Sequence, residues 1–209
     1  GATPEIFLET ENNTFRTMSL AGTQLHRVGA APIWKEKELE EQEMVTKFIQ
    51  SALEDKVSSL EVSGATSFKA GNLWHIKTSV SGNMNNSRLE EIIGALHPTP
   101  AVCGLPKNAA KEFILENENY ERQFYTGFLG ELNFKEDISR PSTRINQENR
   151  AYRTIKNKTS LFVNLRCMQI LGHSVRVYVG GGITSRSLPE KEWQETKDKS
   201  STMLNIVLK

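Results

Sequence analysis

Two acidic pairs far apart in the chain each interrupt an apolar face that repeats with helical spacing. Side chains three and four positions apart share one face of a helix, so residues 35–53 and 189–206 are predicted to be amphipathic helices. A carboxylate that points inward is costly unless a cation or water meets it. The fold must therefore bring a cation, or solvent, to the start of both helices. The pairs are Glu38 with Glu41 and Glu192 with Glu195.

Two interpretations of these pairs are open from their spacing alone. If the pairs face each other, their oxygens form a cage for Mg²⁺, a hard cation held by a few carboxylates plus substrate and water. The chain would then be an enzyme. If both helix starts are solvated, the carboxylates simply favour the positive end of each helix dipole.

Composition and charge narrow the class of protein. The chain has 209 residues, 37% of them hydrophobic, and 26 Lys and Arg balance 25 Asp and Glu, which suits one large domain or two small ones. The near-neutral charge gives no reason to expect a nucleic-acid or membrane partner, and no apolar run is long enough to span a bilayer. Cys103 and Cys167 lack disulfide or metal-site spacing, which predicts a reducing compartment, the cytoplasm. Because the chain opens at Gly1 without an initiator methionine, we expect a piece of a longer protein.

Strands and helices are predicted in mixed order, which favours an α+β or mixed-sheet α/β fold. Residues 135–158 are polar, with seven Lys or Arg, three Asp or Glu and no hydrophobic period, so we expect an insertion loop there rather than a specific binding element. Strands are predicted at residues 6–9, 14–20, 58–62, 73–80, 125–134, 159–170 and 174–180. Helices are predicted at residues 34–55, 88–96, 106–116 and 189–207.

Several other residues have the chemistry of a binding site, although none alone names a function. Arg166, predicted to lie mid-strand, has a planar fork that suits a carboxylate, but it could equally lie on the polar face of a half-exposed strand. Glycines 180–182 could bring backbone N–H groups close to an anion or simply make a turn. Lys199 follows Glu195 at the spacing of a surface ion pair, and a lone His97 is more often structural than catalytic.

Taken together and in order, these motifs resemble the chorismate-utilising enzyme family, which includes isochorismate, salicylate, anthranilate and aminodeoxychorismate synthases. The chain looks most like the isochorismate synthases of menaquinone and siderophore biosynthesis. The resemblance implies a mixed-sheet α+β fold built from two related halves. Residues 1–209 would be the C-terminal part of this chorismate-binding domain, and the N-terminal portion would be missing. The matching segments cover nearly the whole chain outside 135–158: they are residues 1–5, 20–23, 38–46, 97–106, 125–130, 165–167, 178–183 and 192–204.

The resemblance also implies roles for the acidic residues. Glu5, in a Thr-Pro-Glu motif, would be the general acid that protonates the departing 4-hydroxyl of chorismate. Glu41 and Glu195 would be the principal Mg²⁺ ligands. Glu38 and Glu192 would support them directly or through water.

A second set of residues would surround the substrate chorismate. Arg166 and Lys199 would bind its carboxylates, and His97 would lie beside its ring. Ala101 is the clue to the reaction, because ammonia-using and salicylate-forming members tend to carry Thr there. A small apolar side chain favours water as the nucleophile and release of isochorismate without loss of pyruvate. The expected substrate-binding residues are Thr23, His97, Ala101, Tyr125, Arg166, Gly181, Gly182 and Lys199.

Three departures from the family pattern affect the expected activity. Gln42 stands where the family usually has His, and Gln24 where Arg or a similar residue is common. The family's general-base lysine lies upstream of Thr-Pro-Glu, before Gly1, so we expect the chain alone to be inactive. The leading hypothesis is an isomerase, a Mg²⁺-dependent isochorismate synthase with no amidotransferase subunit. Anthranilate, aminodeoxychorismate or salicylate synthesis, and a non-catalytic chorismate-binding fragment, are the alternatives.

Overall fold

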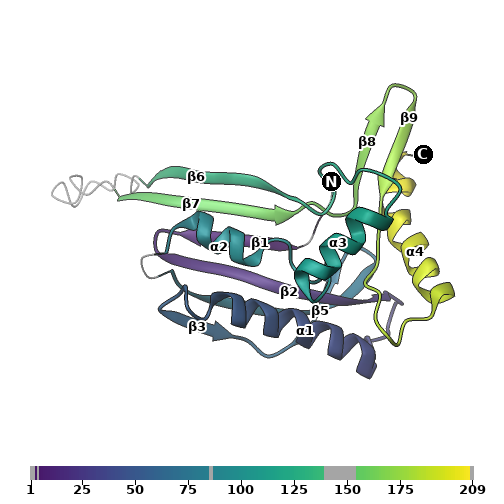
Figure 1. Cartoon of the computed structure of the whole chain (residues 1–209), viewed down its shortest axis with the longest axis horizontal. Coiled ribbons are helices and arrows are strands. Elements are labelled where there is room, and N and C mark those ends of the chain that lie inside the picture. Colours follow the sequence, from purple (N-terminus) through teal and green to yellow (C-terminus); the bar gives the residue numbers. More distant parts are fainter. Residues whose placement is uncertain (1–2, 4, 85–86, 139–153, 208–209) are drawn as a thin grey trace.

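The computed structural model describes residues 3, 5–84, 87–138 and 154–207, and an antiparallel sheet forms its centre (Figure 1). The strand order is β3-β5-β2-β1-β7-β6, with β4 paired to β5, and β8 and β9 form a separate hairpin. With helices packed beside this sheet, the fold is α+β, as predicted. The elements are β1 (Ile6–Glu11), β2 (Thr14–Leu25), α1 (Glu36–Leu53), β3 (Ser59–Val62), β4 (Thr66–Ala70), β5 (Leu73–Asn83), α2 (Leu89–Leu96), α3 (Lys107–Asn117), β6 (Phe128–Ile138), β7 (Thr154–Val163), β8 (Cys167–Leu171), β9 (Ser174–Tyr178) and α4 (Pro189–Val207).

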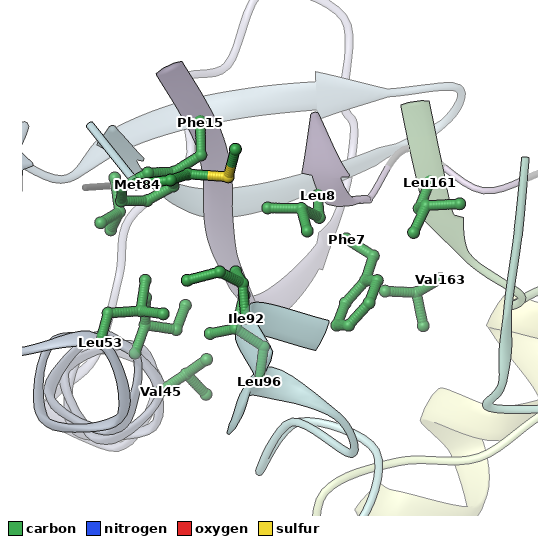
Figure 2. Packing of buried hydrophobic residues seen from close by; sticks show 12 residues of the cluster. Phe7, Leu8, Phe15, Val45, Leu53, Met84, Ile92, Leu96, Leu161 and Val163 are labelled. Carbon is green, nitrogen blue, oxygen red and sulfur yellow. The ribbon is translucent and has the colours of Figure 1, made fainter. Parts of the chain in front are cut away.

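The hydrophobic core lies between the sheet and helices α1 and α2 (Figure 2). Apolar residues return every three or four positions along α1, so Val45, Ile49 and Leu53 share one buried face. Helix α2 adds Ile92 and Leu96, each at most 1% exposed. Full burial of one such side chain contributes about 1.5–3 kcal/mol. This packing fixes α1 along β2 and so determines where its first turn lies.

The strand predicted over residues 159–170 is in fact two strands, and this changes the place of Arg166. The backbone of Arg166, between β7 and β8, has φ +45°, a left-handed conformation that L side chains rarely adopt. Asn164 fixes the break, because its backbone N–H donates to the carbonyl of Gly127 at 2.8 Å and its side-chain amide donates to the carbonyl of Phe124 at 2.8 Å. The prediction that Arg166 lies mid-strand was therefore wrong: it lies at a bend.

The prediction of an insertion loop over residues 135–158 was wrong at both flanks. β6 and β7 extend into this segment and pair antiparallel with each other at one edge of the sheet (Figure 1). Ion pairs between strands replace an apolar pattern here: Lys156 pairs with Glu11, and Lys158 with Glu136. The middle of the segment lies outside the described residues.

β2 was predicted to end at residue 20 but continues to Leu25 through a β-bulge. At this bulge Gly22 and Thr23 of β2 together lie opposite the single residue His75 of β5. An extra residue on one strand leaves part of its backbone outside the ladder of hydrogen bonds. The short strand β4 was not predicted, because most of its side chains are exposed and give no alternating pattern.

Core packing and strand pairing hold the described part of the fold together. Cys103 and Cys167 are both free thiols. In residues 5–84, 87–138 and 154–207, no helix combines the length and the apolar character needed to cross a membrane.

Candidate functional site

The first turns of α1 and α4 meet at one end of the sheet (Figure 1). Lys37 of α1 forms an ion pair with Glu192 of α4 and another with Glu41 at 3.5 Å. Arg186, just before α4, adds a further ion pair with Glu36 at 3.1 Å. Segments from the two ends of the sequence are thus held together, and Glu41 and Glu192 share one cation.

Three carboxylates form an acidic cluster here: Glu41, Glu192 and Glu195. Burial raises the pKa of Glu41, and the charges of Glu195 and Glu192 raise it further against the opposing effect of Lys37. Burial acts in the same direction on the pKa of Glu192, but hydrogen bonds from Lys37 and Ser187 outweigh it and lower that pKa. Because carboxylates are negatively charged, they repel one another, and the cluster attracts positive charge.

Glu195 and Lys199 lie against a stretch of backbone that has no side chains. Glu195 Oε1 is 2.7 Å from Lys199 Nζ, which also donates to the carbonyl of Gly180 at 3.2 Å. A Cβ on Gly181 would lie 3.7 Å from Glu192 Oε2 and 3.9 Å from Glu195 Oε1. These are ordinary van der Waals distances, so the backbone of Gly181 lies beside both carboxylates.

Glu38 has a local role in addition to the one expected for it. Its Oε2 accepts a hydrogen bond from the backbone N–H of Lys35 at 2.9 Å, which satisfies one free backbone N–H at the start of α1. The carboxylate is thereby held at the start of its own helix. A part for Glu38 in metal binding stays a prediction.

Gly22 lets β2 pass close to Glu38. Its φ is +67°, and a Cβ there would lie 3.1 Å from Glu38 Cβ and 3.3 Å from Ile76 Cδ1. We expect Gly22→Ala to lower the free energy of unfolding by about 1–2 kcal/mol through the left-handed backbone, and by about 1–3 kcal/mol more through overpacking. Gly29→Ala is the matched control, because Gly29 has φ +77° with nothing within 4 Å of a Cβ. Urea unfolding compares the two variants, and equal losses would contradict the crowding argument.

A second group lies where the chain enters β1. Glu5 is 4% exposed, and burial raises its pKa to about 8 against the opposing effect of Arg166. Glu5 is therefore protonated at neutral pH, whereas a guanidinium keeps its charge. Nη2 of Arg166 lies 2.7 Å from Nε2 of His75, whose Nδ1 lies 2.9 Å from the carbonyl oxygen of Gly22. A neutral acid and a guanidinium side by side can donate a proton and bind an anion.

Tyr125 lies beside Gly180 of the glycine run, and Thr23 lies near Glu195 of the acidic cluster. The hydroxyl of Tyr125 lies 2.7 Å from the position of a Cβ on Gly180, and its ring stacks on Tyr178 with centroids 5.6 Å apart. Burial raises the pKa of Tyr125 to about 12, so its hydroxyl stays protonated. Thr23 lines a cavity of about 180 Å³ together with Glu195.

His97 lies in an aromatic environment. Its ring packs edge-on against Phe7 and Phe128, with centroids 5.7 and 5.2 Å away. Burial lowers the pKa of His97, which favours the neutral ring. Ala101 and Gly182, which were predicted to bind substrate, are both exposed. Substrate contacts for these residues stay predictions.

The sequence analysis missed Lys37 and His75. Lys37 precedes Glu41 by four residues, which signals only an ordinary pair on a helix surface. His75 is one of the buried residues of β5, but its partner Arg166 is 91 residues away in the chain. Nothing local in the sequence marks either contact.

The acidic cluster suits a hard divalent cation by its chemistry. In the described part of the chain, no group of three or more Asp, Glu, His or Cys side chains is gathered tightly enough to hold a metal ion. The ammonium of Lys37 instead lies between Glu41 and Glu192. Carboxylate oxygens are the ligands that Mg²⁺ prefers. The donor chemistry of these carboxylates would suit Mg²⁺ only if Lys37 moved aside, so Mg²⁺ binding here stays a prediction.

Fold and site together define an α+β protein with an acidic cluster beside groups that can bind a small anion. Residues 1–138 match the profile of a family described as "Chorismate binding enzyme", and residues 152–205 match a second profile with that description. The chain belongs to the chorismate binding enzyme family.

Individual relatives narrow the comparison. The chain is 29% identical over 216 residues to isochorismate synthase EntC of Escherichia coli and 30% identical over 218 residues to isochorismate synthase DhbC of Bacillus subtilis. Each match covers 99% of this chain and 50% of the relative, so the chain spans about half the length of these curated relatives. A Bacillus anthracis crystal structure described as a 2,3-dihydroxybenzoate-specific isochorismate synthase, DhbC, superposes with a TM-score of 0.81 at 27% identity. That match covers 99% of this chain and 52% of the other.

Proposed function

We propose that the complete protein is an isochorismate synthase, an isomerase acting in menaquinone or siderophore biosynthesis. The observation that carries this proposal is Glu5, a buried acid with a pKa of about 8 beside Arg166. The relatives named above support it, because they are themselves isochorismate synthases. Ala101 supports it as well, since a small apolar side chain favours water over ammonia as the nucleophile.

In this reaction water bonds to the ring of chorismate, the double bonds shift, and the 4-hydroxyl departs. Glu5 gives its proton to that hydroxyl, which leaves as water, so one water enters and one leaves. The negative charge left on Glu5 is stabilised by the neighbouring Arg166 guanidinium. The proton of the attacking water passes to a general base, for which the family resemblance indicates a lysine upstream of Gly1.

Binding of the substrate falls to the charged residues around the site. Arg166 and Lys199 bind the carboxylates of chorismate as cationic donors. The carboxylates of the acidic cluster, Glu41, Glu192 and Glu195, would hold Mg²⁺. When bound, this ion supplies positive charge for a substrate carboxylate. Binding of the ion would displace the Lys37 ammonium from between Glu41 and Glu192.

The test is turnover by the complete reading frame that contains this chain. The purified protein is incubated with chorismate, with and without Mg²⁺ and ammonium, and the products are separated by chromatography. We expect isochorismate that depends on Mg²⁺, without pyruvate and without any need for ammonium. Salicylate with pyruvate, or an amino product that needs ammonium, would replace this proposal with another chorismate chemistry. Chorismate binding without turnover would indicate a non-catalytic protein.

A further inference from the structure

We propose that His75 is a positioning residue that holds the Arg166 guanidinium in place for a carboxylate of the substrate, a role that rests on the proposed function. His75 lies on β5, is 4% exposed, and uses both ring nitrogens. Its ring connects the bulge in β2 to the bend between β7 and β8, two irregular places in the backbone.

The two contacts fix which nitrogen of His75 carries the proton. A carbonyl oxygen only accepts, so the nitrogen 2.9 Å from the carbonyl of Gly22, Nδ1, must be the one with hydrogen. A guanidinium only donates, so Nε2, 2.7 Å from Arg166 Nη2, must offer its lone pair. A doubly protonated ring would set two donors against each other. Burial lowers the pKa of His75 to about 4, in agreement with a neutral ring.

The bulge in β2 explains why His75 is available for this task. Gly22 and Thr23 together oppose His75, so the Gly22 carbonyl turns to the His75 side chain instead of a backbone N–H. A buried carbonyl without a donor is costly. The hydrogen bond that satisfies it also fixes the plane of the imidazole. The ring is therefore held from one side and presents Nε2 in a constant direction on the other.

A neutral partner also preserves the charge of Arg166. A carboxylate in the place of His75 would form an ion pair with the guanidinium and compete with an incoming anion. The charged groups that act on His75 are Arg166 and Lys199, both cations, and Glu5, which neighbours Arg166, is protonated at neutral pH. His75 thus orients Arg166 through one nitrogen and leaves its positive charge and remaining N–H groups for the substrate.

Two substitutions of His75 test the contacts of its two ring nitrogens separately. The Asn side-chain amide can reproduce the Nδ1 contact with Gly22 but does not reach Arg166, whereas Gln can place its carbonyl oxygen near the position of Nε2. In the complete protein, we expect His75→Asn to raise KM for chorismate about tenfold, with a smaller effect on kcat, since a charged hydrogen bond is lost. His75→Gln should recover much of that loss. Equal KM values for His75→Asn and the unaltered protein would overturn the proposal.

A double-mutant cycle separates positioning from a general effect on folding. In an Arg166→Ala background, His75→Asn should add little further loss of chorismate affinity, because its partner is already absent. Full additivity of the two losses would contradict a role through Arg166. His173→Asn, at an exposed turn of the β8–β9 hairpin, is the matched control and should leave KM unchanged.

Nitrogen NMR of histidine-labelled protein tests the geometry without substrate. We expect His75 to show a protonated Nδ1 and an unprotonated Nε2 at neutral pH, in the unaltered complete protein. A protonated Nε2 would overturn the proposal whatever the kinetics show. If the unaltered protein failed to convert chorismate, the proposed function would fall, and these ring nitrogens would still decide whether His75 holds Arg166.

Discussion

Replacing Glu5 by glutamine in the complete protein is expected to lower kcat by about 10²–10⁴-fold, the usual contribution of a general acid. Glutamine keeps the shape and the neutral charge of the buried acid but has no proton to transfer. Chorismate binding in the presence of Mg²⁺ should survive, because Glu5 is not one of the carboxylates proposed to hold Mg²⁺ and carries no charge at neutral pH. Steady-state kinetics across Mg²⁺ concentrations measure both effects.

The pH dependence gives this prediction a second readout. The pKa of Glu5 is raised from 4.5 to about 8, so the acid form is present below pH 8 and is lost as the pH rises through that value. Activity should fall over the same range. The free energy of unfolding should also fall as the pH rises from 4.5 towards 8, because the folded state keeps a proton that the unfolded state has released. Glu5→Gln should remove that slope.

The matched control is Glu9→Gln, which changes a partly buried glutamate on the same strand, β1. It should leave kcat within a few-fold of the unaltered protein. Near-normal kcat in Glu5→Gln, or rescue of that variant by more Mg²⁺ alone, would show that Glu5 is not the general acid.

Glu195→Gln is expected to weaken Mg²⁺ and chorismate together, because it removes one charge from the acidic cluster. A loss of roughly 10–100-fold in apparent Mg²⁺ affinity is the scale expected when the ligand environment of a metal is damaged. Glu195 also pairs with Lys199 at 2.7 Å, so the substitution frees that lysine as well. Calorimetric titration of Mg²⁺ and turnover at several Mg²⁺ concentrations measure the effect.

Glu190→Gln provides the control for Glu195→Gln, since Glu190 is an exposed acid in the first turn of the same helix, α4. It should leave Mg²⁺ affinity unchanged. If both variants lost the same affinity, or if Glu195→Gln lost only kcat at every Mg²⁺ concentration, Glu195 would not act through a metal.

Local patterns in the sequence predicted most of the regular elements for a physical reason. The apolar positions of residues 35–53 repeat with helical spacing, so α1 could be located from its own residues, and in the structure the face of α1 that carries Val45 packs on the sheet. The strand predicted at residues 174–180 was likewise located from its own residues and is present as β9. A helix or strand whose pattern of apolar residues lies within its own segment can be predicted from that segment alone.

The errors arose where the structure depends on contacts between distant segments. Arg166 lies at a bend because Asn164 bonds to backbone carbonyls at Phe124 and Gly127, which no pattern within 159–170 reveals. The paired strands β6 and β7 lack an apolar period in this segment: Lys158 of β7 pairs with Glu136 of β6, and Lys156 of β7 pairs with Glu11 of the neighbouring strand β1.

The candidate site was predictable in part. Glu41 and Glu192 could be proposed as neighbours because each lies on an inward-facing position of its helix. The cation between them could not, since Lys37 and Glu192 are 155 residues apart. The same holds for His75, whose function depends on Arg166 and a bulge in another strand. Side-chain types indicate what a site can do, but only the fold shows which side chains meet.

The most direct test of the account is to locate a divalent cation in the complete protein. Crystals grown with chorismate and Mn²⁺, which replaces Mg²⁺ and scatters anomalously, give the ion's position without reference to any assumed ligand. We expect one anomalous peak between Glu41 and Glu195, with Lys37 turned away from the acidic cluster and a chorismate carboxylate at the ion. Bound chorismate with no peak at this place, and Lys37 still paired with Glu41 and Glu192, would contradict the account.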